Sequence, residues 1–129
     1  MPNNVAPLSD RPLTQVGLTV RDLDRSRHFY RDVLGLSLLF EVNGMLFFQL
    51  AGLRLMVGRA YKADQPIGGS ILYFDAPDFD AAVGALESRG VAFLSDAQVL
   101  QRTDTHELRL RSFMDPDGNA LALMGMVAR

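Results

Sequence analysis

Histidine and cysteine, two residue types that often bind metals or take part in catalysis, are scarce in this chain. Its 129 residues include two histidines, His28 and His106, and no cysteine. The lack of cysteine excludes a disulfide framework, a thiolate zinc site and a cysteine nucleophile. His28 falls in a predicted helix, off the apolar stripe that contains Phe29 and Val33, so we expect its imidazole to point to solvent.

The second histidine has acidic neighbours. His106 stands in the segment QRTDTHEL (101–108), close to Asp104 and Glu107, and these three side chains could bind a metal ion. Adjacent residues on a strand point to opposite faces, however, which separates His106 from Glu107. We therefore favour a surface position for His106 over a chemical role.

The composition predicts one soluble domain. Hydrophobic residues make up 48% of the chain, which is enough for one well-filled core. No run of about 18 apolar residues could span a bilayer, and the N-terminal MPNNVAPLSD lacks the regions of a signal peptide. A net charge of -2 gives no field that would attract nucleic acid or an anionic membrane. We expect a cytoplasmic protein without nucleic-acid or membrane partners.

The first half of the chain predicts a strand, a helix and three strands. Residues 13–20 alternate between apolar and polar or small side chains, as in a strand with one face on a core. Asp22 is a helix N-cap candidate, and the helical stripe that follows ends at Gly35. Three further strands are predicted over 36–42, 45–50 and 53–58, separated by short turns.

The second half repeats this order. We predict a strand over 71–76, a helix capped by Asp78 and ending at Gly90, and strands over 91–95, 107–114 and 120–126. The spacing from Asp22 to Gly35 is one residue longer than that from Asp78 to Gly90, which places an inserted residue in the first helix. An internal duplication of a βαβββ unit explains the pattern. We expect an arm over 1–11 and a single domain over 12–126, with module one at about 12–60 and module two at about 68–126.

Three segments carry a family resemblance: VGLTVRDLDRSRHFYRDVLGL (16–36), LYFDAPDFDAAVGALESRGV (72–91) and DPDGNALAL (115–123). They resemble the vicinal oxygen chelate (VOC) superfamily, which includes glyoxalase I, extradiol dioxygenases, fosfomycin resistance enzymes and bleomycin resistance proteins. The resemblance implies an α+β fold in which two tandem βαβββ modules form a curved mixed sheet around a cleft. It also implies a homodimer.

The resemblance places the metal ligands of glyoxalase-like members at four positions of this chain. Gln15 and Ile71 stand where each module would carry a histidine, seven residues before its cap aspartate, and Ala122 stands where the last strand would carry a glutamate. Matching LRLMV of module one to ALALM of module two makes Met56, the counterpart of Ala122, the fourth ligand position. A catalytic divalent ion needs about three nitrogen or oxygen ligands, and only Gln15 offers one, a weak amide oxygen. We expect no metal and no cofactor.

Strand alternation predicts which side chains line the cleft instead. The expected lining is Gln15, Arg54, Met56, Ile71, Tyr73, Asp75, Arg109, Arg111, Phe113 and Ala122. If Arg109, Arg111 and Phe113 face the cleft, the alternating Leu108 and Leu110 pack into the core. Three questions stay open: the arginines of residues 109–111 line the cleft or are solvated and paired with acidic residues, and Tyr73 is a ligand contact or a packing residue. Met45, Phe47 and Phe48 belong to the core or a dimer interface, or else form a ligand-binding aromatic shelf.

The leading hypothesis is metal-independent binding of a small organic molecule in the cleft, similar in type to bleomycin resistance proteins. Arginine, tyrosine and phenylalanine suit a planar or carboxylated ligand. One alternative is a glyoxalase-like lyase, isomerase or dioxygenase with relocated metal ligands drawn from Asp75, Asp104, His106 and Glu107. A second alternative is a structural or interaction dimer. The sequence favours a protein without catalysis and identifies no catalytic residue.

Overall fold

The computed structural model describes residues 8–129, so most of the predicted arm, residues 1–7, lies outside the described part. Module one consists of β1 (Gln15–Val20), α1 (Leu23–Arg27), η1 (His28–Val33), β2 (Ser37–Val42), β3 (Met45–Gln49) and β4 (Arg54–Arg59). Its sheet has the order β1-β4-β3-β2, with β1 parallel to β4 and the other pairs antiparallel. The first predicted βαβββ unit is confirmed.

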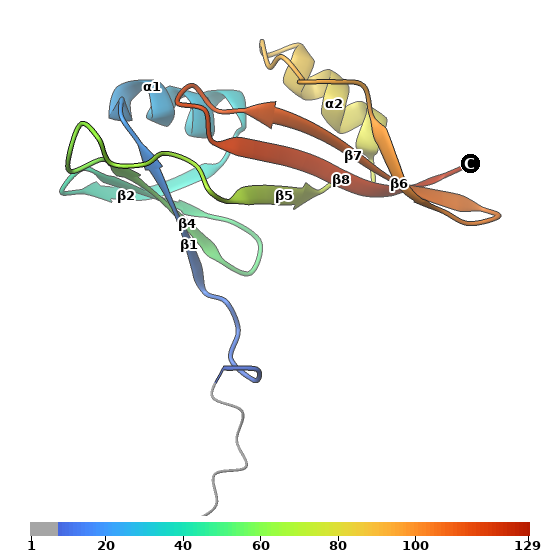
Figure 1. Cartoon of the computed structure of the whole chain (residues 1–129), viewed down its shortest axis with the longest axis horizontal. Coiled ribbons are helices and arrows are strands. Elements are labelled where there is room, and N and C mark those ends of the chain that lie inside the picture. Colours follow the sequence, from blue (N-terminus) through green and yellow to red (C-terminus); the bar gives the residue numbers. More distant parts are fainter. Residues whose placement is uncertain (1–7) are drawn as a thin grey trace, which may run out of the picture.

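Module two repeats this topology. It contains β5 (Ile71–Asp75), α2 (Phe79–Glu87), β6 (Gln98–Arg102), β7 (His106–Met114) and β8 (Ala120–Ala128), in the sheet order β5-β8-β7-β6. The helices of both modules lie on the same side of the molecule, above the two sheets (Figure 1). The structure confirms the predicted α+β fold of two tandem modules. Within residues 8–129, no helix has the length and apolar character needed to cross a membrane.

One predicted strand is wrong. Residues 91–95 contribute only an isolated bridge between Phe93 and Phe113, and the first strand after α2 is β6. The segment QVLQR that forms β6 is exposed along its whole length. Its pairing with β7 therefore depends on backbone hydrogen bonds at a sheet edge rather than on an apolar pattern that the sequence could reveal.

The extra residue of the first helix is accommodated as a π-helix. Asp22 caps α1, its side chain accepting a hydrogen bond from the backbone of Arg25 at 2.9 Å. The helix then widens into η1, whose end shows an i to i−5 hydrogen bond from Leu34 N to Phe29 O at 2.9 Å. α2 has no such segment. A π segment is a common way to absorb an insertion without unravelling a helix, and here it buries Phe29 and Tyr30.

The two modules meet at the turn between β7 and β8. Asp115 is buried there, and its carboxylate accepts hydrogen bonds from the Tyr30 hydroxyl (2.7 Å), the backbone N–H groups of Asp117 (2.9 Å) and Asn119 (2.8 Å), and the Asn119 side chain (2.8 Å). The Asn119 amide also donates to Thr19 O of β1 at 2.9 Å. Burial, and then the Asp115 charge, raise the pKa of the Tyr30 hydroxyl far above its ordinary value, so it remains a donor. This network ties helix η1 and strand β1 to module two.

Candidate ligand-binding face

Each sheet has one face covered by its helix and one that no helix covers, which we call the open face. Residues paired in register point to the same side of a sheet. On β1 and β4, Leu18, Val20, Leu55 and Val57 are buried on the helix side. The alternate positions of the same strands therefore lie on the open face, and they include Gln15, Gly17, Arg54, Met56 and Gly58.

A cation and two aromatic rings are grouped on the open face of module one. The Arg54 Nε donates to Gln15 Oε1 at 3.0 Å, and the Arg54 Cζ lies 5.6 Å from the centroid of the Phe47 ring. The Phe47 ring stacks on Phe40, with centroids 4.6 Å apart and an angle of 22° between planes. Phe40 is 46% exposed. We call these four residues the Arg54–Phe47 shelf.

Met56 fills the surface next to this shelf. A Cβ placed on Gly17 would come within 3.3 Å of Met56 Cε, and one on Gly58 within 3.1 Å of Met56 Sδ. The thioether therefore lies across both glycines, and their lack of side chains makes room for it. All five methionines in residues 8–129 take positions on the open face: Met45, Met56, Met114, Met124 and Met126. Methionine adapts its shape to what it contacts, so this surface is more deformable than one made of branched side chains.

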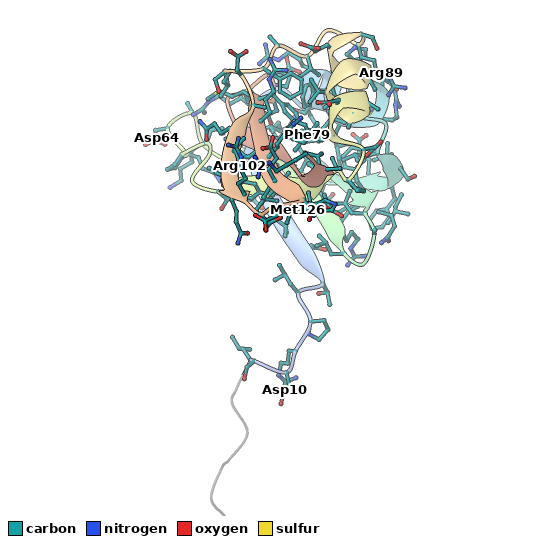
Figure 2. All side chains as sticks on the ribbon, turned by 90° about the vertical axis from the view of Figure 1, so that its right-hand side faces the viewer. Asp10, Asp64, Phe79, Arg89, Arg102 and Met126 are labelled. Atoms are coloured by element: carbon teal, nitrogen blue, oxygen red, sulfur yellow. The ribbon has the colours of Figure 1, made fainter. Side chains whose placement is uncertain are left out.

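The open face of module two is more apolar. Ile71 and Tyr73 are about half exposed there, beside Asp75. Ala122 pairs with Tyr73 and is itself covered by its neighbours. Figure 2 shows Met126 on the lower side of the molecule, away from Phe79 at the start of α2. The side chains predicted for the cleft on β1, β4, β5 and β8 thus lie on the open face, in the orientation that strand alternation indicated.

The predicted orientation of β7 is wrong. Phe113 is buried on the helix side, where its ring packs against Phe29 and Phe93 with centroids 6.5 and 5.4 Å away. Arg111 lies on the same side, with its Cζ 4.7 Å from the Phe93 ring centroid and its Nε donating to Ser95 O at 2.8 Å. Leu108 and Leu110, expected in the core, lie on the open face instead, because they alternate with these residues.

Arg109 also points to the helix side. Its Nε donates to Glu107 Oε1 at 2.8 Å, and its Nη1 lies 3.5 Å from Asp80 Oδ1 of α2. Glu107 receives a second hydrogen bond, from Arg102 at 3.1 Å. The Arg109 hydrogen bond holds the pKa of the Glu107 carboxyl below its ordinary value, against the opposing effect of desolvation. Neither Arg109 nor Arg111 contributes charge to the open face.

The two histidines are not brought together with acidic groups in a metal-binding arrangement. The exposed His28 contacts Asp32, with 3.1 Å between Nδ1 and Oδ2. His106 contacts Thr105 Oγ1 through Nδ1 at 2.9 Å, while Glu107 is engaged by arginines on the helix side. Across residues 8–129, no three His, Cys, Asp or Glu side chains gather closely enough to hold an ion.

The comparison with known families decides the classification. A model of the Glyoxalase/Bleomycin resistance protein/Dioxygenase superfamily matches residues 13–123. The chain belongs to this superfamily. The four positions of the implied metal ligands carry one amide, one thioether and two hydrocarbon side chains, and this donor set does not fit a divalent ion that prefers His, Asp or Glu.

Solved structures of superfamily members share the fold. A lactoylglutathione lyase from Agrobacterium tumefaciens is 21% identical, with 89% of this chain and 93% of that chain covered and a TM-score of 0.71. A superfamily member from Sphaerobacter thermophilus is 22% identical, with 88% and 95% covered and a TM-score of 0.71. One from Alicyclobacillus acidocaldarius is 20% identical, with 92% and 93% covered and a TM-score of 0.70. At these identities the likeness shows the fold alone.

Sequence reasoning placed the aromatic residues of β3 second to the arginines. It favoured a core or dimer-interface position for Phe47 and Phe48 over a ligand-binding aromatic shelf, but the two residues alternate. Phe48 is fully buried with Leu46, whereas Phe47 is paired with Met56 on the open face. Strand alternation could have separated the two residues, because Met45 and Phe47 are two residues apart and alternate with the core residues Leu46 and Phe48.

Proposed function

We propose that the open face binds a small, flat organic anion without the help of a metal ion. The observation that carries this proposal is the Arg54–Phe47 shelf. A guanidinium can pair with a carboxylate through two parallel hydrogen bonds, and a planar ring can stack on an exposed aromatic surface. The Arg54 Nε donates to Gln15, which orients the guanidinium. Within residues 8–129 the two Nη groups have no hydrogen-bond partner, so they are available to a ligand.

The surroundings of the shelf favour binding over catalysis. The nearby methionines offer apolar, adaptable contacts but no acid, base or nucleophile. Tyr73 and Asp75 lie on the open face of the other module, and neither has a hydrogen-bonded partner in the described residues that would activate it. With Arg109 and Arg111 turned away, Arg54 supplies the positive charge among the residues predicted for the cleft. We assign ligand recognition to it.

A homodimer accompanies this proposal. Phe40, Ile71, Tyr73 and Met126 are each between about 45% and 51% exposed on the open faces, which leaves apolar surface that a partner could bury. A second copy placed over these faces would cover them and convert an open surface into an enclosed cleft. The same exposure is what a purely structural dimer would show, so ligand binding is the property that separates the two functions.

The test is a thermal-shift screen of aromatic acids and their neutral amides, followed by calorimetry with 2-naphthoate. We expect acids to bind more tightly than amides. Replacing Arg54 with Met keeps approximate volume and removes the charge, so the affinity for 2-naphthoate should fall by more than about tenfold, or about 1.4 kcal/mol. Arg59→Met is the matched control, because Arg59 is on the same strand, β4, but at a position that points to the other face of the sheet. Equal affinity in the wild type and the Arg54 variant would show that the shelf is not the site.

A further inference from the structure

A cavity lies on the helix side of the sheets, between the helical segments of the two modules. Its volume is about 240 Å³. Phe74 of β5, Leu123 of β8, Leu34 just after η1 and Ala85 of α2 are among the residues that line it. Ala85 is itself exposed, so the cavity opens to solvent beside this residue. We call this space the interhelix cavity.

One charged residue lines the interhelix cavity. Arg89 follows α2 and is seen at the top of the molecule in Figure 2. Its Nη1 donates to Val33 O at 3.2 Å, so the side chain reaches from module two to the last residue of η1. The other lining side chains are aliphatic or aromatic, and the remaining guanidinium N–H groups of Arg89 have no partner within the described part of the chain.

We infer that the interhelix cavity is a binding site for a small carboxylic acid with a single ring or short alkyl chain. The carboxylate pairs with Arg89, and the apolar body lies between Leu34 and Ala85. The volume of about 240 Å³ has room for a single ring, because an enclosed apolar cavity of about 150 Å³ already holds benzene, and this cavity is in addition open to solvent beside Ala85 and Arg89. An arginine at the edge of an otherwise apolar space selects an amphipathic anion, since a neutral hydrocarbon leaves the guanidinium without a partner and a polar anion leaves the apolar walls wet. This site is separate from the open face and does not depend on it.

The experiment uses 3-phenylpropionate and its neutral counterpart 3-phenylpropan-1-ol as calorimetric probes of the whole chain. The acid should bind at least fivefold more tightly than the alcohol. Ala85→Phe places a large side chain at the mouth of the cavity and should weaken both probes by more than tenfold. Arg89→Met should remove the preference for the acid while the affinity for the alcohol stays within about twofold, and Arg89→Lys should restore part of that preference. Arg59→Met, an exposed arginine outside the cavity, should leave both affinities unchanged.

The outcomes discriminate between this cavity and the open face. Unchanged affinity in Ala85→Phe, with its unfolding temperature close to that of the wild type, overturns the proposal. So does binding that is lost in Arg54→Met but retained in Ala85→Phe, because that result places the acid on the open face. If Ala85→Phe folds poorly, Arg89→Met decides alone, since Arg89 is exposed and its replacement removes only the bond to Val33. An equal preference for the acid in Arg89→Met and wild type then overturns the proposal.

Discussion

Replacing Gly125 with alanine is expected to destabilise the protein by about 3 kcal/mol or more, which is a large fraction of the stability of a small domain. Gly125 lies on the helix side of β8. It is next to Ala76, which lies in the segment that connects β5 to α2. A Cβ at this position would overlap the backbone carbonyl of Ala76. That carbonyl cannot move away easily, because the Ala76 N–H is hydrogen-bonded to Met124 O at 2.8 Å. Urea unfolding of the purified variant measures the loss.

Gly84 of α2 provides the matched control. A Cβ at Gly84 meets nothing within 4 Å, and its backbone is helical. Gly84→Ala should therefore stabilise the protein by about 0.5 to 1 kcal/mol, because alanine loses less backbone entropy in a helix. A Gly125→Ala protein as stable as the wild type would show that Ala76 and Gly125 are not in close backbone contact.

The second large effect is expected at the junction between the modules. Asp115→Asn keeps the shape of the side chain but replaces one acceptor oxygen with an NH₂ group that faces hydrogen-bond donors. In the wild type, the buried Asp115 carboxylate accepts four hydrogen bonds. We expect a loss of about 3 kcal/mol in the free energy of unfolding, measured by urea denaturation at neutral pH.

Tyr30→Phe tests the same junction from the other side. It removes a single donor and leaves the other three hydrogen bonds of Asp115 in place, so a loss of about 1 kcal/mol is expected. The double variant should lose less than the sum of the two, because Tyr30 and Asp115 contact each other at 2.7 Å. An Asp115→Asn protein within about 0.5 kcal/mol of the wild type would mean that this network does not hold the modules together.

The sequence predicted strand orientation well where one face of a strand is distinctly more apolar than the other. On β1, Leu18 and Val20 alternate with Gly17 and Thr19, so the buried face is evident. The duplication then carried the same arrangement to module two. The inserted residue of the first helix was also visible in the sequence, and the structure accommodates it in η1.

The orientation of β7 could not be derived from the same rule. Its core-side positions include Arg109 and Arg111, which are stabilised by acidic residues of α2 and by the Phe93 ring, while its open face holds two leucines. Apolar residues on an uncovered face and arginines beneath a helix give the reverse of the usual pattern. Only the position of α2 next to these arginines shows which face of β7 is buried.

The Arg54–Phe47 shelf depends on a second feature that alternation does not encode. The pairing of β2 with β3 shifts register between Leu38 and Phe40, so that Phe40 rather than Leu39 is opposite Phe47. An irregularity of this kind moves side chains to the other face of a strand. Without it, the stacked aromatic pair would not form.

Calorimetric titration of chelator-treated protein with 2-naphthoate tests the central claim most directly. The protein is dialysed against EDTA, returned to metal-free buffer, and titrated with and without added zinc or manganese. Because Gln15, Met56, Ile71 and Ala122 do not provide a divalent-ion site, we predict the same dissociation constant in all three conditions. Binding that disappears after EDTA and returns with one of the metals would contradict this account.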